Sequence, residues 1–184
     1  MRNWRHSATA LSSFVLLAAA FCSPAFAACS LASQGEGRVV AVMDGRTFRL
    51  DDGREVRLAG VEVDIPKPAV SGVFKLASLI EGRPVALHAD DDKPDRYGRQ
   101  IAVVNLVGSD TSVQTELLSQ GDALFSGIMS DKECSAEWIA AENAAREARR
   151  GVWAADSVTK NAEMPGDILA RTGRYTVVEG TVVT

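Results

Sequence analysis

Two short arginine-bearing segments carry the clearest chemical signal in the sequence. They are Glu55-Val-Arg-Leu-Ala-Gly60 and Asp95-Arg-Tyr-Gly-Arg99, and each places a guanidinium beside a tight or apolar stretch of backbone. A pair of fixed guanidinium groups suits phosphate recognition, because each can donate two parallel hydrogen bonds to the phosphate oxygens. Arg57 and Arg99 are therefore candidate phosphate-binding residues.

The two segments belong to a longer series of motifs. The series covers about 120 residues and consists of Asp44-Gly-x-Thr47, Val56-Arg-Leu-x-Gly-Val61, Asp95-x-Tyr-Gly-Arg99, a Val-x3-Leu-x3-Gly-x-Ala stretch from Val113 to Ala123, and a Glu-x5-Glu-x4-Glu-x5-Trp stretch from Glu137 to Trp153. In order and spacing, these motifs resemble the staphylococcal-nuclease-like (thermonuclease) family. The resemblance implies the oligonucleotide-binding (OB) barrel fold and a function directed at nucleic acid or nucleotides.

The resemblance also implies roles for individual residues. In that family, one Ca²⁺ is held by carboxylates from an Asp-Gly-Asp-Thr turn and from an acid that follows the Arg-Leu strand, and two arginines clamp the phosphate. By position, Asp44 and Glu62 match metal ligands, and Arg57 and Arg99 match the clamping arginines. Tyr97 matches a tyrosine near the ligand pocket.

The sequence departs from the family pattern where the catalytic acids are expected. Arg46 occupies the second acidic position of the turn, and the usual Asp-x-Pro-Glu is replaced by Glu62-Val-Asp-Ile-Pro-Lys67, so that no carboxylate occupies the position of the Glu thought to activate water. If the alignment is shifted by two residues, Asp64 takes the ligand position, but Lys67 then fills the position of the base. Because Ca²⁺ prefers several oxygen ligands and a positioned base gives about 10²- to 10⁴-fold in rate, we expect weak or lost Ca²⁺ binding and weak or absent nuclease activity.

Three interpretations are open. The first is a domain with a degraded catalytic set that retains a phosphate- or nucleic-acid-binding pocket lined by Arg57, Arg99 and Arg46, or that serves as a protein-interaction module. The second is an active metal-dependent nuclease, in which Asp44, Glu62 and Asp64 surround a divalent ion and the two clamping arginines stabilise the transition state, so that Glu62, Asp64 and both arginines are catalytic. In the third, the arginines only pair with nearby carboxylates, and this ion network replaces the metal.

The strands and helices that must position these residues can be predicted from the spacing of the apolar residues. Val56 and Leu58 alternate with Arg57, which places Arg57 on the face of a strand opposite the core. We predict an α+β, mainly β domain: a closed antiparallel five-stranded OB barrel with three helices. The expected strands are 37–43, 47–50, 55–61, 85–89 and 99–107, and the expected helices are 70–80, 112–120 and 131–150.

Three regions are expected along the chain. Residues 1–27 combine a charged start, an apolar stretch and an Ala-Phe-Ala cleavage site, which is typical of a secretory signal peptide. Residues 28–155 form the nuclease-like domain. Residues 156–184 are expected to be a linker and the start of a truncated second β-rich unit, because 179–183 echoes 36–40 in sequence. The protein is thus expected in the periplasm or outside the cell, without a membrane span. A lipid on Cys29 is the less favoured alternative, since Phe26 fits that signal poorly.

Charge and cysteine content narrow the function further. The formal net charge is −4 at pH 7, and −6 once residues 1–27, which hold two arginines and no acid, are removed. An acidic chain is disfavoured as a general nucleic-acid binder, because such binding depends on neutralising phosphates. Cys29 and Cys134 are the cysteines outside the signal peptide and are expected to form a disulfide. The sequence does not indicate an oligomeric state.

Overall fold

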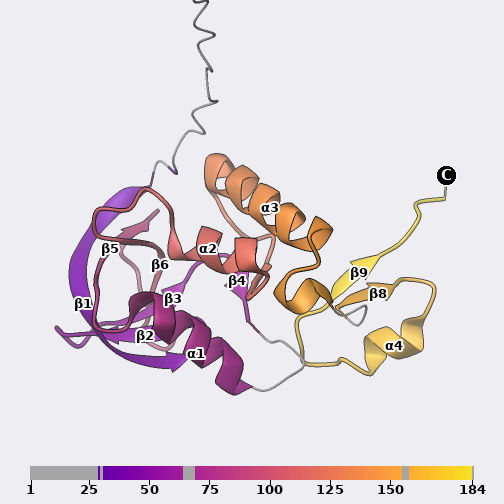
Figure 1. Cartoon of the computed structure of the whole chain (residues 1–184), viewed down its shortest axis with the longest axis horizontal. Helices are drawn as coiled ribbons and strands as arrows, with labels where there is room; N and C mark the ends of the chain where they lie inside the picture. Colours follow the sequence, from indigo (N-terminus) through magenta and orange to yellow (C-terminus); the bar gives the residue numbers. More distant parts are fainter. Residues whose placement is uncertain (1–28, 30, 64–68, 155–157, 184) are drawn as a thin grey trace, which may run out of the picture.

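A closed barrel of five strands forms the centre of the computed structural model, which describes residues 29, 31–63, 69–154 and 158–183 (Figure 1). This confirms the predicted α+β class and the OB-like barrel. In barrel order the strands are β1 (Ala32–Asp44), β2 (Thr47–Leu50), β3 (Glu55–Leu58), β6 (Gln100–Leu106) and β5 (Pro84–Ala89).

The 13-residue strand β1 closes the barrel, because it pairs with β2 at one end and with β5 at the other. Four of the five barrel pairings are antiparallel, but β3 and β6 pair in parallel. The prediction of an antiparallel barrel was therefore wrong at this pairing. Two strands joined by a long connection can meet in either direction, and hydrophobic alternation within each strand does not encode which.

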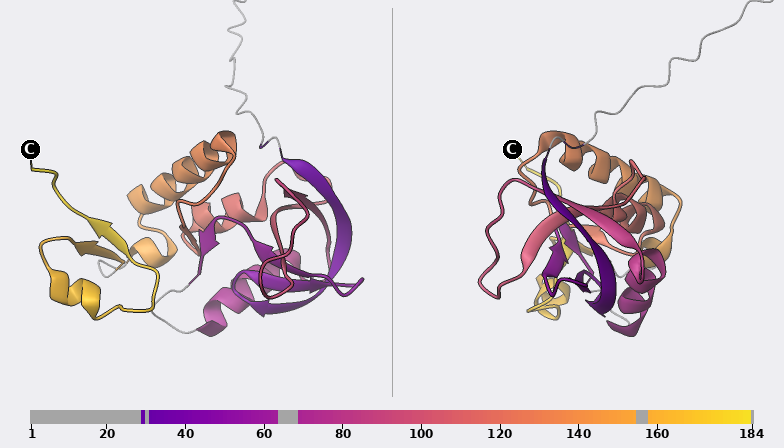
Figure 2. Two further views of the ribbon diagram at one scale, coloured as in Figure 1. Left: turned by 180° about the vertical axis from the view of Figure 1, so that it is seen from behind. Right: turned by 90° about the vertical axis from the view of Figure 1, so that its left-hand side faces the viewer.

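Three predicted helices are confirmed, with small shifts at their ends. Helix α2 (Val113–Gln120) packs against α3 (Lys132–Glu147) and β6, while α1 (Ala69–Ile80) contacts β1 (Figures 1 and 2). A fourth helix and short strands were not predicted. The remaining elements are β4 (Val61–Glu62), α1 (Ala69–Ile80), α2 (Val113–Gln120), β7 (Leu124–Phe125), α3 (Lys132–Glu147), the 3-10 helix η1 (Gly151–Ala154), β8 (Thr159–Asn161), α4 (Pro165–Leu169) and β9 (Val177–Glu179).

The predicted strand 55–61 is divided into β3 and β4 by a sharp turn. Gly60 adopts a φ of +67°, and a Cβ atom there would lie 2.3 Å from Cζ3 of Trp138. Only glycine therefore fits between the fully buried Trp138 and the turn that leads into β4. This turn takes Glu62 away from the barrel wall and pairs β4 with β7 in a separate two-stranded sheet.

The predicted disulfide between Cys29 and Cys134 is confirmed, with Cα atoms 4.9 Å apart. It ties the segment before β1 to the first turn of α3, where the Asp131 side chain also accepts a hydrogen bond from the Cys134 N–H. None of the helices within the described residues is long and apolar enough to cross a bilayer. The predicted signal peptide lies outside the described residues.

The segment from Val158 onward forms a small β8–α4–β9 unit beside the end of α3 (Figures 1 and 2). Its strands β8 and β9 pair in parallel. The predicted boundary at residue 155 falls on residues that are not described, so the division into domain and linker stays a prediction. A small apolar cluster joins the segment to the rest of the chain, formed by Leu124, Ala145, Val152, Trp153, Val158, Tyr175 and Val177.

Candidate functional site

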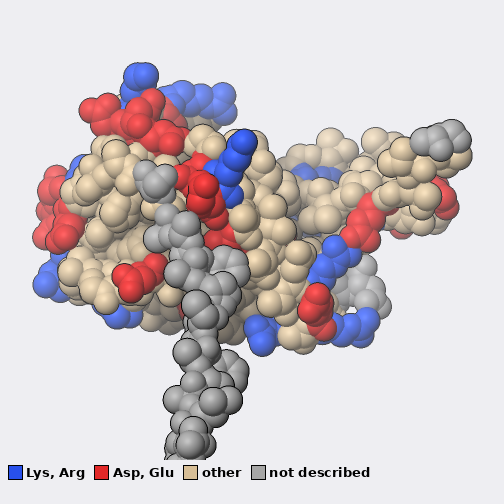
Figure 3. All heavy atoms as spheres, turned by 90° about the horizontal axis from the view of Figure 1, so that it is seen from above, with Lys and Arg blue, Asp and Glu red and all other residues tan. Residues whose placement is uncertain are grey.

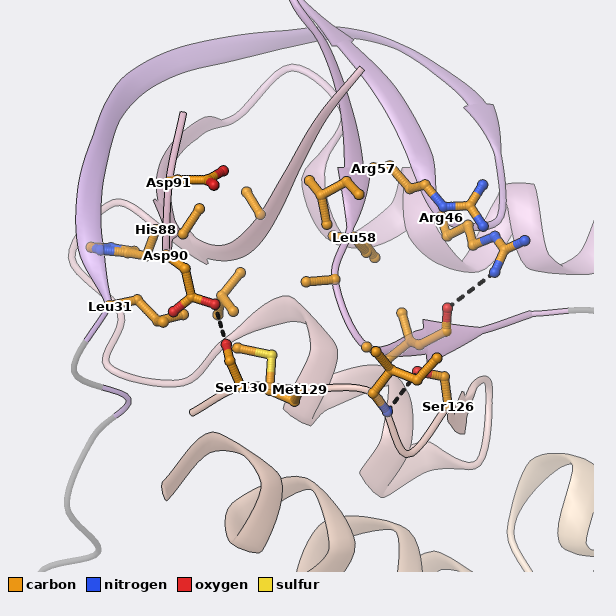
Figure 4. A pocket seen from close by; sticks show the side chains of 18 of the residues that line it. Leu31, Arg46, Arg57, Leu58, His88, Asp90, Asp91, Ser126, Met129 and Ser130 are labelled. Atoms are coloured by element: carbon orange, nitrogen blue, oxygen red, sulfur yellow. Dashed lines mark hydrogen bonds between the residues drawn. The ribbon is translucent and has the colours of Figure 1, made fainter. Parts of the chain in front are cut away.

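A cleft of about 500 Å³ runs along the outside of the barrel between strand β3 and the loop 126–130 that follows β7 (Figure 4). Arg46 and Arg57 lie at one end of the cleft, and Asp90 and Asp91 lie at the other. The cleft thus has a cationic end and an anionic end. Of the predicted phosphate-binding arginines, Arg46 and Arg57 belong to the cationic end, whereas Arg99 does not line the cleft.

Arg57 occupies the middle of β3, where Val56 and Leu58 are buried and its own side chain points outward, as predicted. Its guanidinium forms no hydrogen bond or ion pair with any residue of the described chain. Burial lowers the pKa of Arg57, and the positive charges of Arg46 and Arg99 lower it further. Glu62 and Asp44 act in the opposite direction. As far as the described residues go, Arg57 therefore carries unused donors, which favours the approach of an anion.

Arg46 is held in place by both backbone and side-chain contacts. Its N–H donates to Asp44 Oδ1 at 2.8 Å, and its Nη1 donates to the Val61 carbonyl at 3.3 Å. The same Nη1 forms an ion pair with the Glu62 carboxylate. Gly45 keeps the turn tight, because a Cβ atom there would lie 2.6 Å from Val63 Cγ1. Arg46 thus neutralises Glu62, one of the two expected metal ligands.

The described residues of this site do not fit Ca²⁺. The ion prefers six to eight oxygen ligands. Here Glu62 is paired with a guanidinium, and one oxygen of Asp44 accepts a backbone hydrogen bond. Within the described chain, three metal-binding side chains come together only at Cys29, Asp131 and Cys134, where the cysteines are already joined as the disulfide.

Arg99 lies just before β6 and is fixed by a carboxylate four residues earlier. Its Nε and Nη2 donate to Asp95 Oδ2 at 2.9 and 2.7 Å, while Asp95 Oδ1 accepts the N–H groups of Tyr97 and Arg99 at 2.8 and 3.0 Å. The hydrogen bonds from the Arg99 side chain are the main cause that lowers the pKa of Asp95 to about 2. Unlike Arg57, Arg99 therefore already has a strong anionic partner.

Tyr97 presents a mostly exposed ring beside Arg99. The Cζ atoms of Arg96 and Arg99 lie 4.8 and 5.0 Å from the ring centroid, within the range of a cation–π contact. The side chain of Tyr97 is 65% exposed. The ring is therefore accessible to a ligand, but it is not among the residues that line the cleft.

The structure thus brings Arg46, Arg57 and Glu62 together at one end of the cleft. Arg99 is near enough for its charge to lower the pKa of Arg57, and Asp44 acts on both arginines in the opposite direction. Asp64 and Lys67 lie outside the described residues, and their roles stay predictions.

Two contacts of the site were missed by sequence reasoning. Asp95 was not expected to be the partner of Arg99, although their spacing across the turn was a usable signal. The contact between Ser130 and Asp90, which closes the far end of the cleft, joins residues 40 positions apart and has no local signal (Figure 4).

Comparison with protein families identifies one similarity. The model of the staphylococcal nuclease homologue family matches residues 74–155, which is less than half of the chain. The match contains Tyr97, Asp95 and Arg99 but begins after Asp44, Arg57 and Glu62. No curated protein matches the chain. The resemblance read from the motifs is thus confirmed, while the roles of the individual site residues stay predictions.

Proposed function

The chain contains a staphylococcal-nuclease-like domain, which indicates a nucleic-acid-related function, and from this premise we propose that it binds phosphorylated ligands without cleaving them efficiently. The ligand class is single-stranded nucleic acid or a nucleotide. The phosphate would lie at the cationic end of the cleft defined above. One observation carries this proposal: Arg57 has no described partner, while its neighbour Arg46 neutralises the carboxylate next to it.

The arginines and the apolar residues around the cleft have different parts in binding the phosphorylated ligand. Arg57 donates its unused hydrogen bonds to the phosphate, and Arg99 adds long-range attraction from its position next to Asp95. Arg46 holds Glu62 away from Arg57, so that the carboxylate does not compete with the phosphate. The apolar wall formed by Leu58 and Ile101 excludes water from one side of the ligand.

Efficient cleavage is not expected, for two reasons. The guanidinium of Arg46 lies beside Glu62, where a catalytic cation would need the free carboxylate. The resemblance leaves no carboxylate at the position of the general base in either alignment, and loss of such a base costs about 10²- to 10⁴-fold in rate. Metal-dependent cleavage is the alternative function, and the test below distinguishes it.

The acidic net charge sets a limit on the ligand. Acidic and basic side chains are interspersed on the face shown in Figure 3, which presents no broad basic patch. Non-specific binding to long duplexes depends on many phosphate contacts. We therefore expect recognition of one or two phosphates in the cleft and little affinity for duplex DNA.

We also propose that the protein works outside the cytoplasm. The disulfide between Cys29 and Cys134 indicates an oxidising environment, such as the periplasm or the extracellular space. Secretion through the predicted signal peptide would place it there.

The test compares two variants with the same change in charge. Arg57→Gln should weaken the binding of a fluorescein-labelled ten-nucleotide oligothymidylate by about 10-fold or more, the loss of a charge-assisted hydrogen bond. Arg174→Gln is the control, because the Arg174 side chain is exposed and makes no contact with the cleft. Fluorescence anisotropy gives both affinities. Equal losses of affinity in the two variants, or no binding by the wild type, would contradict the proposal. Cleavage products of the oligonucleotide on a gel would favour the alternative function, metal-dependent cleavage.

A further inference from the structure

The outer edge of β7 is completed by two side chains instead of a third strand. In the β4–β7 pair, Val61 faces Phe125, whose N–H donates to Glu142 Oε1 at 2.8 Å. The carbonyl of Phe125 accepts a hydrogen bond from the Tyr175 hydroxyl at 2.7 Å. Backbone groups at a sheet edge are normally left to solvent. Here Glu142 from α3 and Tyr175 from the C-terminal segment hold both of them.

Tyr175 is anchored where it makes this contact. Its ring packs in the small apolar cluster with the buried residues Leu124 and Trp153. A few residues later, Glu179 forms an ion pair with Arg146 of α3. Figures 1 and 2 both show β9 beside the C-terminal end of α3. The segment 158–179 is therefore fastened on both sides of the Tyr175 contact.

The contact reaches the candidate site through β4. Within the part of the chain that the structure describes, this strand consists of Val61 and Glu62, and its sheet contains one other strand, β7. Glu62 lies opposite Leu124, so its backbone position depends on β7. Burial raises the pKa of Tyr175, and the negative charges of Glu142 and Glu62 raise it further. The hydroxyl therefore stays protonated at neutral pH as a donor and lies within electrostatic range of Glu62.

We propose that Tyr175 is a positioning residue of the anion site: by holding β7 it holds β4, and thereby keeps Glu62 paired with Arg46 and away from Arg57. The C-terminal segment is then a working part of the site. Without the hydroxyl, β4 loosens and the Glu62 carboxylate becomes free to pair with Arg57, where it competes with the phosphate. The expected effect on oligonucleotide binding rests on the proposed function, whereas the expected effect on the backbone of β4 and β7 does not.

The first arm of the test measures backbone protection in the full mature chain. Tyr175→Phe keeps the ring in the apolar cluster and removes only the hydroxyl. Amide hydrogen exchange should become faster in β4 and β7 and stay unchanged in β2 and β3 of the barrel. Thr176→Val is the matched control, because it removes the neighbouring hydroxyl, which accepts from Arg171 Nε and donates to the Arg174 carbonyl and forms no hydrogen bond with β7 among the described residues. Unchanged exchange in β4 and β7 of Tyr175→Phe would overturn the proposal.

The second arm asks whether the effect passes through Glu62. Tyr175→Phe should weaken oligothymidylate binding by about fivefold, and this loss should vanish when Glu62→Gln is already present, because a neutral side chain does not compete for Arg57. A purely structural role would give the same loss in both backgrounds, and that result would overturn the proposal. If the wild type fails to bind the oligonucleotide, the proposed function fails, and the exchange measurement alone decides whether Tyr175 holds β4.

Discussion

The three arginines of the site differ in what holds them. Arg46 is paired with Glu62, Arg99 is paired with Asp95, and Arg57 has no described partner. A guanidinium that is already paired gives up an existing ion pair when it binds a ligand, whereas an unpaired one does not. Affinity for an anion is therefore expected to depend mainly on Arg57.

The depressed pKa of Asp95 leads to a prediction about pH. A carboxyl group whose pKa is lower in the folded than in the unfolded state stabilises the protein above the unfolded value, and this contribution is lost as the pH falls through the folded value. The folded pKa of Asp95 is about 2, against an ordinary value of 3.8. The melting temperature of the wild type should exceed that of Asp95→Asn at pH 7.

This difference should shrink between about pH 4 and pH 2. Thermal unfolding followed by circular dichroism at several pH values gives the measurement. Asp110→Asn serves as a control, since Asp110 makes no ion pair within the described residues. A wild-type advantage over Asp95→Asn that stays constant down to pH 2 would show that the Asp95–Arg99 contact does not depend on the carboxylate charge.

The pairing of Arg46 with Glu62 leads to a second prediction. Arg46→Asp together with Lys67→Glu frees Glu62 and restores acids at the two positions where the sequence departs from the family pattern. Calcium affinity should rise, because added carboxylates supply the oxygen ligands that Ca²⁺ requires. Isothermal titration calorimetry measures the change.

The control for this gain in calcium affinity must carry the same net charge as the double variant. Arg174→Asp with Lys132→Glu makes the same change in charge at positions that do not line the cleft. An equal gain in the control would attribute the effect to net charge, and no gain in the double variant would refute the assignment of Arg46 to the ligand position.

At the scale of elements, the fold depends on a few sharp turns, which hydrophobic periodicity in the sequence predicts only in part. The alternation around Arg57 correctly predicted its outward orientation, and the apolar stripe through Trp138 correctly predicted α3. The division of one expected strand into β3 and β4 was missed, because the hydrophobic pattern of residues 55–61 is that of a single strand. The need for glycine at position 60 follows from the close approach of Trp138, which the local sequence does not reveal. Contacts that complete the site join distant positions, as Tyr175 and Phe125 do, and these have no local pattern.

Gly60 therefore provides a prediction for the turn that separates β3 from β4. Gly60→Ala should destabilise the fold by about 1–3 kcal/mol or more, since it combines backbone strain with a clash against Trp138. Gly53→Ala is the control for strain alone, because Gly53 has a φ of +90° and nothing lies within 4 Å of its added Cβ. Urea unfolding gives the two free energies. A similar loss in both variants would mean that packing against Trp138 does not fix the turn.

At the scale of the whole molecule, an acidic chain carries a small cationic site. The formal net charge is −4, yet Arg57 at one end of the cleft is close enough to Arg46 and Arg99 for both positive charges to lower its pKa. The disulfide ties the segment before β1 to α3, and Glu142 of α3 and Tyr175 of the C-terminal segment both bond to the backbone of Phe125 in β7. The proposed function therefore requires only that this local positive charge meets the phosphate of a ligand small enough to enter the cleft.

The most direct test of this account is the affinity of the mature protein for the ten-nucleotide oligothymidylate, measured once with a chelator and once with millimolar Ca²⁺. Since Arg46 already neutralises Glu62, the two affinities should agree within about twofold, and the oligonucleotide should be recovered intact. Binding that requires Ca²⁺, or cleavage that appears only when Ca²⁺ is added, would contradict it.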